Sequence, residues 1–158
     1  MTRRLLIMAA ICSMLALLAG CDSEQRRLDE EVRRLCAEDG GVKVYETVKL
    51  TPELLDRYGR IRTPSIERAK KSDEYYYVQE RVYLKGSEVS EDYEARMWRT
   101  VHKIIRRSDG RVLGESIDYV RRGGGILSPP FHPSSFSCSD ISKSPAIETS
   151  IFVKENDK

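Results

Sequence analysis

Residues 93–122 read YEARMWRTVHKIIRRSDGRVLGESIDYVRR, two long strand-like runs on either side of the turn sequence Ser-Asp-Gly at 108–110. Asp-Gly between such runs is the strongest short-range signal for a β-hairpin. We therefore expect strands over 93–106 and 111–122. The run before them, residues 74–85, is rich in Tyr and Val and predicts a third strand. Together these segments predict an antiparallel three-strand meander.

The register of this hairpin follows from its cross-strand pairs. A two-residue loop would set Val101 against Asp118, whereas a three-residue loop sets Val101 against Ile117, and paired apolar side chains stabilise a sheet. The three-residue loop also pairs Ile105 with Leu113, Lys103 with Glu115 and Arg99 with Tyr119. We predict this second register, with Gly110 in the left-handed conformation as a bulge residue. Both faces of the hairpin carry mixed side chains, so we expect each face to be partly covered.

A helix is expected before the meander. Leu28, Val32, Leu35 and Cys36 form one narrow apolar stripe at helical spacing, and Gly40-Gly41 ends the pattern. The predicted elements of this region are a helix over 23–38, a half-buried strand over 42–50, a short helix from Thr51-Pro52 to Gly59, and a single turn from Thr63-Pro64 to Lys70. The helix could serve as a partner-binding coiled coil, but it holds only about two heptads. We expect it to pack on its own domain, which gives an α+β fold with a mainly antiparallel sheet.

The C-terminal part lacks a periodic pattern. Gly123-Gly124-Gly125 should end the sheet, and residues 126–146 are rich in Ser and Pro. We expect them to wrap the surface as an irregular segment, and residues 147–154 to form a weak strand.

The first 20 residues differ in composition from the rest. Arg3 and Arg4 precede an uncharged apolar run over 5–18. Fourteen helical residues span about 21 Å, too short for a bilayer core of about 30 Å. This pattern is typical of a secretory signal peptide, and the alternative is an uncleaved anchor. The expected organisation is therefore a signal peptide over 1–20, an α+β domain over 21–122 and an irregular segment over 123–158.

The end of this signal, Leu-Ala-Gly-Cys at 18–21, resembles the lipobox of bacterial lipoproteins. The resemblance implies cleavage before Cys21, a diacylglycerol thioether on its sulfur and often a further fatty acid such as palmitate on the new amine. Two or more chains hold a protein stably on a membrane. Asp22 resembles a retention signal for the inner membrane of enteric bacteria, but other bacteria use different positions. The expected location is the cell envelope, facing the periplasm or exterior, on either membrane.

Two cysteines remain after Cys12 leaves with the signal and Cys21 carries lipid. In an oxidising compartment Cys36 and Cys138 are expected to form a disulfide, and the alternative is a pair of buried free thiols. No Cys-x-x-Cys sequence occurs, which argues against a redox enzyme. Cys138 would hold the C-terminal segment to the body of the domain.

Charge and catalytic residues exclude several functions. Without residues 1–20, the chain holds 25 basic and 25 acidic side chains, a balance that argues against nucleic-acid binding. His102 and His132 are the two histidines, and neither lies in a metal-binding pattern. No serine lies in a nucleophile motif. We therefore expect no enzyme activity, no cofactor and no metal.

Aromatic and basic side chains are the most suggestive features. The aromatic set is Tyr75, Tyr76, Tyr77, Tyr83, Tyr93 and Trp98. Such rings on a sheet can stack on sugars or bury a peptide, although they could equally fill a core that is poor in Leu and Phe. Arg121-Arg122 and Arg106-Arg107 lie at the two ends of the hairpin, either solvated or in contact with lipid phosphate or an acidic partner.

The sequence predicts a membrane-anchored envelope lipoprotein with a structural or protein-interaction role. The alternative is a module that binds a glycan or small ligand with its Tyr- and Trp-rich sheet. Its expected partners are the membrane, through Cys21, and an envelope protein or glycan.

Overall fold

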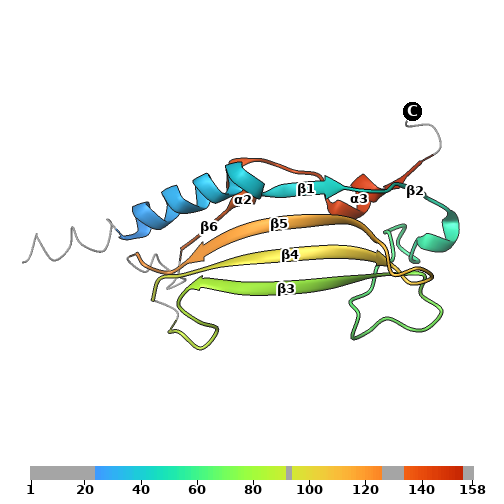
Figure 1. Cartoon of the computed structure of the whole chain (residues 1–158), viewed down its shortest axis with the longest axis horizontal. Coiled ribbons are helices and arrows are strands. Elements are labelled where there is room, and N and C mark those ends of the chain that lie inside the picture. The colour runs from blue at the N-terminus through green and yellow to red at the C-terminus, as the bar shows by residue number, and fades with distance from the viewer. Residues whose placement is uncertain (1–23, 92–93, 126–133, 155–158) are drawn as a thin grey trace, which may run out of the picture.

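The structure is a computed structural model that describes residues 24–91, 94–125 and 134–154. Its elements are a helix over residues 24–39, β1 (Gly41–Val44), β2 (Val48–Lys49), the 3-10 helix η1 (Pro52–Leu54), β3 (Tyr75–Lys85), β4 (Arg96–Arg106), β5 (Val112–Arg122), β6 (Ser135–Ser137), α2 (Cys138–Ile141), α3 (Ile147–Ile151) and β7 (Phe152–Val153). The main sheet has the order β1–β5–β4–β3, and β6 also pairs with β5 (Figure 1). A long helix with a mainly antiparallel sheet confirms the α+β class.

The meander of β3, β4 and β5 is antiparallel throughout, as predicted. Val101 pairs with Ile117, and the predicted pairs of Lys103 with Glu115 and of Arg99 with Tyr119 are also present. The predicted register is therefore confirmed along most of the hairpin.

The end of the hairpin next to the turn differs from the prediction. Ile105 pairs with Val112 instead of Leu113, across an irregularity in the register. The Arg106 N–H donates to the Arg111 carbonyl at 2.9 Å, so the loop has four residues, 107–110, and the prediction of three is wrong. A bulge at Leu113 takes up the extra residue. We attribute this bulge to packing, because the Leu113 side chain is completely buried.

Gly110 has a φ of +70°, as predicted for the turn. Gly110→Val is expected to lower the free energy of unfolding by more than about 1 kcal/mol, because a β-branched residue is strained there. A Cβ at this position would have no heavy atom within 4 Å, so the loss would reflect backbone strain alone. Urea denaturation measures the effect. Gly110→Asn is the control and should cost less, since Asn tolerates this conformation; equal stability of the Val variant and the parent would contradict the turn geometry.

The strand predicted over 42–50 is two strands in different sheets. β1 pairs antiparallel with β5, and β2 pairs parallel with β7. Between them, the N–H groups of Tyr45 and Glu46 both donate to the Leu113 carbonyl, at 2.8 and 3.0 Å. This shared acceptor ends the regular ladder, so alternation predicted extended backbone but not the change of partner.

The helix expected from Thr51 to Gly59 is only the single 3-10 turn η1. Thr51 makes no side-chain capping hydrogen bond. Leu55 instead forms an antiparallel bridge with Ile61, and the chain reverses between them with Gly59 at a φ of +74°. Residues 55–61 are therefore a small hairpin.

The C-terminal part is more regular than the sequence indicates. The described residues 134–146 include β6, which pairs with the end of β5, and the helical turn α2. The weak strand expected over 147–154 is mostly α3, followed by β7. Ile147, Ile151 and Phe152 are all buried. Tertiary burial of these three side chains explains why a short segment without a periodic pattern folds.

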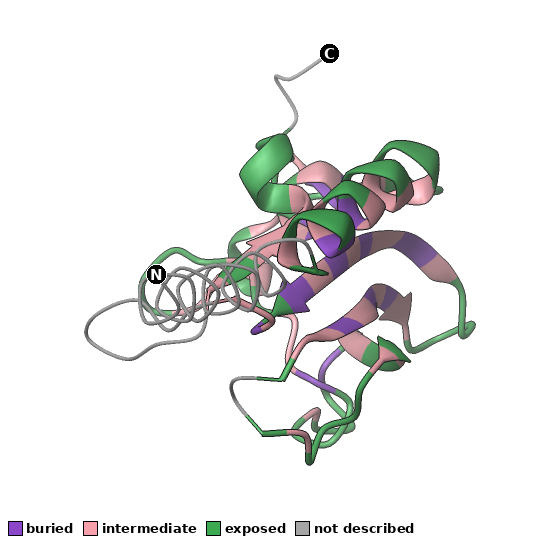
Figure 2. Cartoon of the chain, turned by 90° about the vertical axis from the view of Figure 1, so that its left-hand side faces the viewer, coloured by how far each residue is buried: buried purple, intermediate pink, exposed green. Residues whose placement is uncertain are grey.

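Two buried clusters lie on opposite faces of the sheet. Met97 and Val101 of β4 cluster with Leu28 and Val32 of the long helix, and with Ile117 and Tyr119 of β5. Ile104 points to the other face, because side chains alternate along a strand, and it clusters with Leu113, Ile147, Ile151 and Phe152. Figure 2 shows the buried residues near the helices and the central strands, with exposed residues on the outer turns.

The predicted disulfide between Cys36 and Cys138 is present, with 5.5 Å between the Cα atoms. It joins the end of the long helix to the start of α2. Beside it, Asp39 accepts hydrogen bonds from the Tyr119 hydroxyl at 2.7 Å and from Arg99 at 3.2 Å. These bonds hold the pKa of Asp39 below its usual range, mainly through Tyr119, whereas burial raises the pKa of Tyr119.

Candidate functional site

A shallow groove of about 480 Å³ crosses β3, β4 and β5 and ends at α3. Its lining residues come from alternate positions of each strand, so they share the face that α3 partly covers. They are Gln79, Arg81, Trp98, Thr100, His102, Ser116, Asp118, Val120, Ala146, Ile147 and Glu148. Hydrogen-bonding groups and one indole ring thus line an open sheet face.

Aromatic rings and a guanidinium lie against one another along this face. The Tyr83 and Trp98 rings lie 5.8 Å apart, and the Arg81 guanidinium lies 5.4 Å from the Trp98 ring centre. Farther along, Tyr77 stacks on His102 at 5.6 Å. Each ring therefore has a neighbour that restricts its rotation. Such preordered rings suit a flat polar ligand or an extended peptide.

Asp118 lines the groove from a partly buried position. Burial raises the pKa of its carboxyl group, because the charged form is less well solvated there. One oxygen accepts a hydrogen bond from the Cys138 N–H at 3.1 Å. Asp118 thus caps the start of α2 from the neighbouring strand, which is a structural role.

The outer edge of β3 is the second feature of this region. The N–H of Tyr77 donates to the Pro64 carbonyl, and its carbonyl accepts from the Ile66 N–H, both at 2.9 Å. Because outward backbone groups alternate, those of Gln79 and Arg81 also point away from β4. Within the described residues, no strand pairs with β3 on that side.

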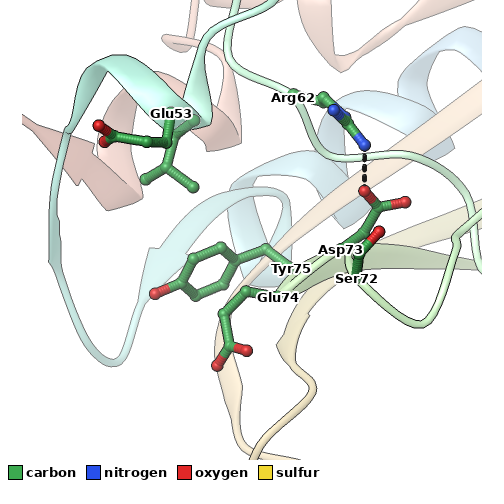
Figure 3. A pocket seen from close by; sticks show the side chains of 7 residues that line it. Glu53, Arg62, Ser72, Asp73, Glu74 and Tyr75 are labelled. Atoms are coloured by element: carbon green, nitrogen blue, oxygen red, sulfur yellow. Dashed lines mark hydrogen bonds and ion pairs between the residues drawn. The ribbon is translucent and has the colours of Figure 1, made fainter.

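A second cavity, of about 310 Å³, lies at the N-terminal end of β3 (Figure 3). Arg62 forms an ion pair across it with Asp73. Asp73 also accepts the Lys70 N–H at 2.7 Å, and this bond, with the charge of Arg62, lowers the pKa of Asp73. In Figure 3, Glu53 and Glu74 lie on either side of the Tyr75 ring. Since the buried Asp73 is already bound by the Arg62 guanidinium and the Lys70 N–H, we regard the cavity as structural.

The aromatic residues singled out from the sequence do not form one site. Tyr77, Tyr83 and Trp98 lie on the groove face, whereas Tyr76 points to the opposite face and has Arg107 over its ring at 4.8 Å. Tyr75 packs on Phe152 at 5.0 Å, next to the second buried cluster. Tyr93, His132, Cys12 and Cys21 lie outside the described residues.

The interpretation of the hairpin arginines as solvated is wrong for two of the four, Arg106 and Arg121. Arg106 binds Glu46 and Asp109, and the Arg107 Nε donates to the Asp73 carbonyl at 2.8 Å. Arg121 is only 1% exposed. Arg107 and Arg122 are both exposed.

Arg121 is the most connected side chain that sequence reasoning missed. Its guanidinium binds both carboxylate oxygens of Asp29, at 2.8 and 3.2 Å. It also donates to the carbonyls of Ser134 and Gly123 and to the Ser134 hydroxyl, at 2.8, 3.1 and 2.7 Å. A signal was available, because Arg121 follows Ile117 and Tyr119 at alternate positions and so shares their covered face.

No protein-family model, curated protein or solved structure matches this chain. Within the part of the chain that the structure describes, no group of three or more His, Cys, Asp or Glu side chains could hold a metal ion. No helix in the described ranges is both long and apolar enough to span a bilayer. The open face of β3 and β4, with the free edge of β3, is therefore the candidate site on geometry alone.

Proposed function

We propose that this protein is a membrane-anchored lipoprotein of the bacterial envelope with a structural or protein-interaction role. The lipobox-like sequence at 18–21 is the basis for the anchor, and it lies outside the described residues. The Cys36–Cys138 disulfide supports the location, because disulfides persist mainly in oxidising compartments. The proposal includes no catalytic step.

The long helix is inferred to be a rigid connector between the lipid and the sheet. Its described part begins at residue 24, three residues after Cys21. The burial of Leu28 and Val32, the Asp29–Arg121 ion pair and the disulfide support a helix packed on the sheet. A short tether would then keep this end of the domain close to the bilayer.

The free edge of β3 carries the proposed interaction role. An extended partner segment can add to such an edge by main-chain hydrogen bonds, while neighbouring side chains select its sequence. Val82 and Leu84 are 57% and 46% exposed beside this edge. A partner strand would cover part of this apolar surface and satisfy the outward backbone groups of Gln79 and Arg81.

Site-specific photo-crosslinking in cells tests this role. Val82→p-benzoylphenylalanine should yield a covalent adduct with an envelope protein, whereas the same change at Ile141, which is 46% exposed on α2, should not. Adding Arg81→Pro should abolish the adduct, since it removes an outward N–H that β4 does not use. Arg81→Ala keeps the N–H and should leave the adduct. Adducts that survive Arg81→Pro would contradict strand addition.

Glycan binding is the second candidate, and the groove beside Trp98 favours it. An indole ring with Gln79, Arg81 and His102 nearby offers both stacking and hydrogen bonds to a sugar. If this role is correct, the protein should be retained on peptidoglycan and Trp98→Ala should release it. Retention on glycan without any protein adduct at Val82 would reverse the order of the two proposals.

The anchor is tested at Cys21. Cys21→Ala is expected to leave unprocessed precursor and to abolish labelling by a fatty-acid analogue, because the thioether forms on this sulfur. Click detection after metabolic labelling measures the result, with the Cys12→Ala variant as the control that keeps its label. Labelling that survives Cys21→Ala would remove the lipoprotein proposal.

A further inference from the structure

Positive charge is concentrated in the segment between η1 and β3. Residues 56–73 contain six basic and three acidic side chains, a net charge of +3, although the whole chain carries only +2. The rest of the chain is therefore slightly acidic. The basic residues are Arg57, Arg60, Arg62, Arg68, Lys70 and Lys71, and all six are exposed.

The first half of this segment presents an ordered group of guanidiniums. Asp56 holds the small hairpin by accepting the N–H groups of Tyr58 and Arg60, at 2.8 and 2.9 Å. Tyr58 is 65% exposed, and the guanidiniums of Arg57 and Arg60 lie 4.7 and 5.1 Å from its ring centre. The ring thus positions two cations at the surface before any ligand binds.

The second half adds three further cations. The N–H groups of Arg68 and Ala69 donate to the Ser65 carbonyl at 2.9 and 2.8 Å, and Ser65 is buried. This turn presents Arg68, Lys70 and Lys71. The Arg62–Asp73 ion pair joins the start of the turn to its end.

Internal acids neutralise only part of this charge. Asp56 pairs with Arg60, and Asp73 pairs with Arg62. Among the described residues, no ion pair involves Arg57, Lys70 or Lys71. Their charges are therefore available to an external anion.

We propose that the exposed surface of residues 57–71 binds an anionic glycan of the envelope through its phosphate or carboxylate groups. Guanidinium groups bind both kinds of oxyanion in a bidentate manner, and lysines add charge without strict geometry. Several weak contacts along one polymer sum to useful affinity, although each exposed pair alone contributes little.

The position of this surface favours a polymer over the anchoring bilayer. Lys85, at one end of β3, pairs with Glu24 near the proposed anchor, whereas residues 56–73 precede the opposite end (Figure 1). An 11-residue strand spans about 35 Å, several times the Debye length of about 8 Å in physiological salt. If β3 runs away from the bilayer, the charge of the lipid headgroups is screened before it reaches residues 56–73. This orientation rests on the proposed lipid anchor, but the binding itself does not.

The test measures binding of the full-length protein in neutral detergent. The probes are inorganic polyphosphate, polygalacturonate and neutral dextran, with phosphatidylglycerol vesicles in a separate arm. We expect binding to one or both polyanions and none to dextran; the preferred polymer distinguishes phosphate from carboxylate ligands. Arg57→Gln/Lys70→Gln/Lys71→Gln should weaken binding about tenfold and reduce the slope of log affinity against log salt by about 2.

A matched variant removes three exposed positive charges elsewhere, Arg27→Gln/Arg33→Gln/Lys143→Gln, and should bind as the parent does. Equal loss in both variants, or no binding to either polyanion, would overturn the proposal. Binding to the anionic vesicles alone would overturn it in favour of a lipid surface. These variants leave the edge of β3 unchanged. A negative result in this binding test would therefore leave the crosslinking result at Val82 unaffected, and the two proposals can fail separately.

Discussion

Arg121→Met is expected to lower the free energy of unfolding by about 3–5 kcal/mol, the usual cost of removing one partner from a buried ion pair. Asp29 would lose both of its bonds to the guanidinium and remain partly buried as an unpaired charge. The Ser134 and Gly123 carbonyls would lose a donor as well. The helix, the end of β5 and the chain leading to β6 would thus lose a shared connection.

Chemical denaturation of the purified protein measures this loss. Arg122→Met is the matched control, because the adjacent Arg122 is exposed, and it should change stability by less than about 1 kcal/mol. The double variant Arg121→Met/Asp29→Leu should recover part of the loss, since no isolated charge then remains. If Arg121→Met and Arg122→Met were equally mild, the buried position of Arg121 would be contradicted.

Removal of the disulfide is the second large effect. Cys36→Ala/Cys138→Ala should lower stability by about 2–5 kcal/mol, because the unfolded chain gains the freedom of a long loop. The bond spans 102 positions of sequence. The sequence alone suggests that residues 126–158 come free first. The structure narrows this expectation to the region of β6 and α2, because Ile147, Ile151 and Phe152 are buried independently of the bond.

Limited proteolysis with mass spectrometry locates the first cleavage. It should fall within 134–146 in the double variant, before any cut in 147–153 or in the meander. The parent treated with reductant should give the same pattern, which separates loss of the bond from the side-chain changes. Two alkylatable thiols in protein from the envelope, or first cleavage within the meander, would contradict this account.

Local sequence patterns were sufficient to predict the meander and the disulfide. Alternating side chains and an Asp-Gly turn favour one register, and Val101 does pair with Ile117. Only two cysteines, Cys36 and Cys138, lie outside the predicted signal and lipobox, so their pairing could be predicted without knowledge of the fold. The predicted loop length was wrong, because the complete burial of Leu113 favours a bulge and a four-residue loop.

The candidate site depended on contacts between distant residues. The groove combines alternate positions of three strands with α3, a helix that no periodic pattern indicated. The free edge of β3 could not be predicted either, since it depends on which strands lie beside it. The excess of basic residues over 56–73 can be read from the composition. The turns that present these residues depend on hydrogen bonds to Asp56 and Ser65 and on the Arg62–Asp73 ion pair.

Arg121 and Asp29 show the same division most clearly. The sequence places both residues correctly, one near the end of a strand and one in the first half of a helix. Nothing local links them, because 92 positions separate them along the chain. Alternation and capping act over a few residues, so they determine strands, turns and register. Whether a charge is buried depends on which element covers it, and that is determined by packing across the whole domain.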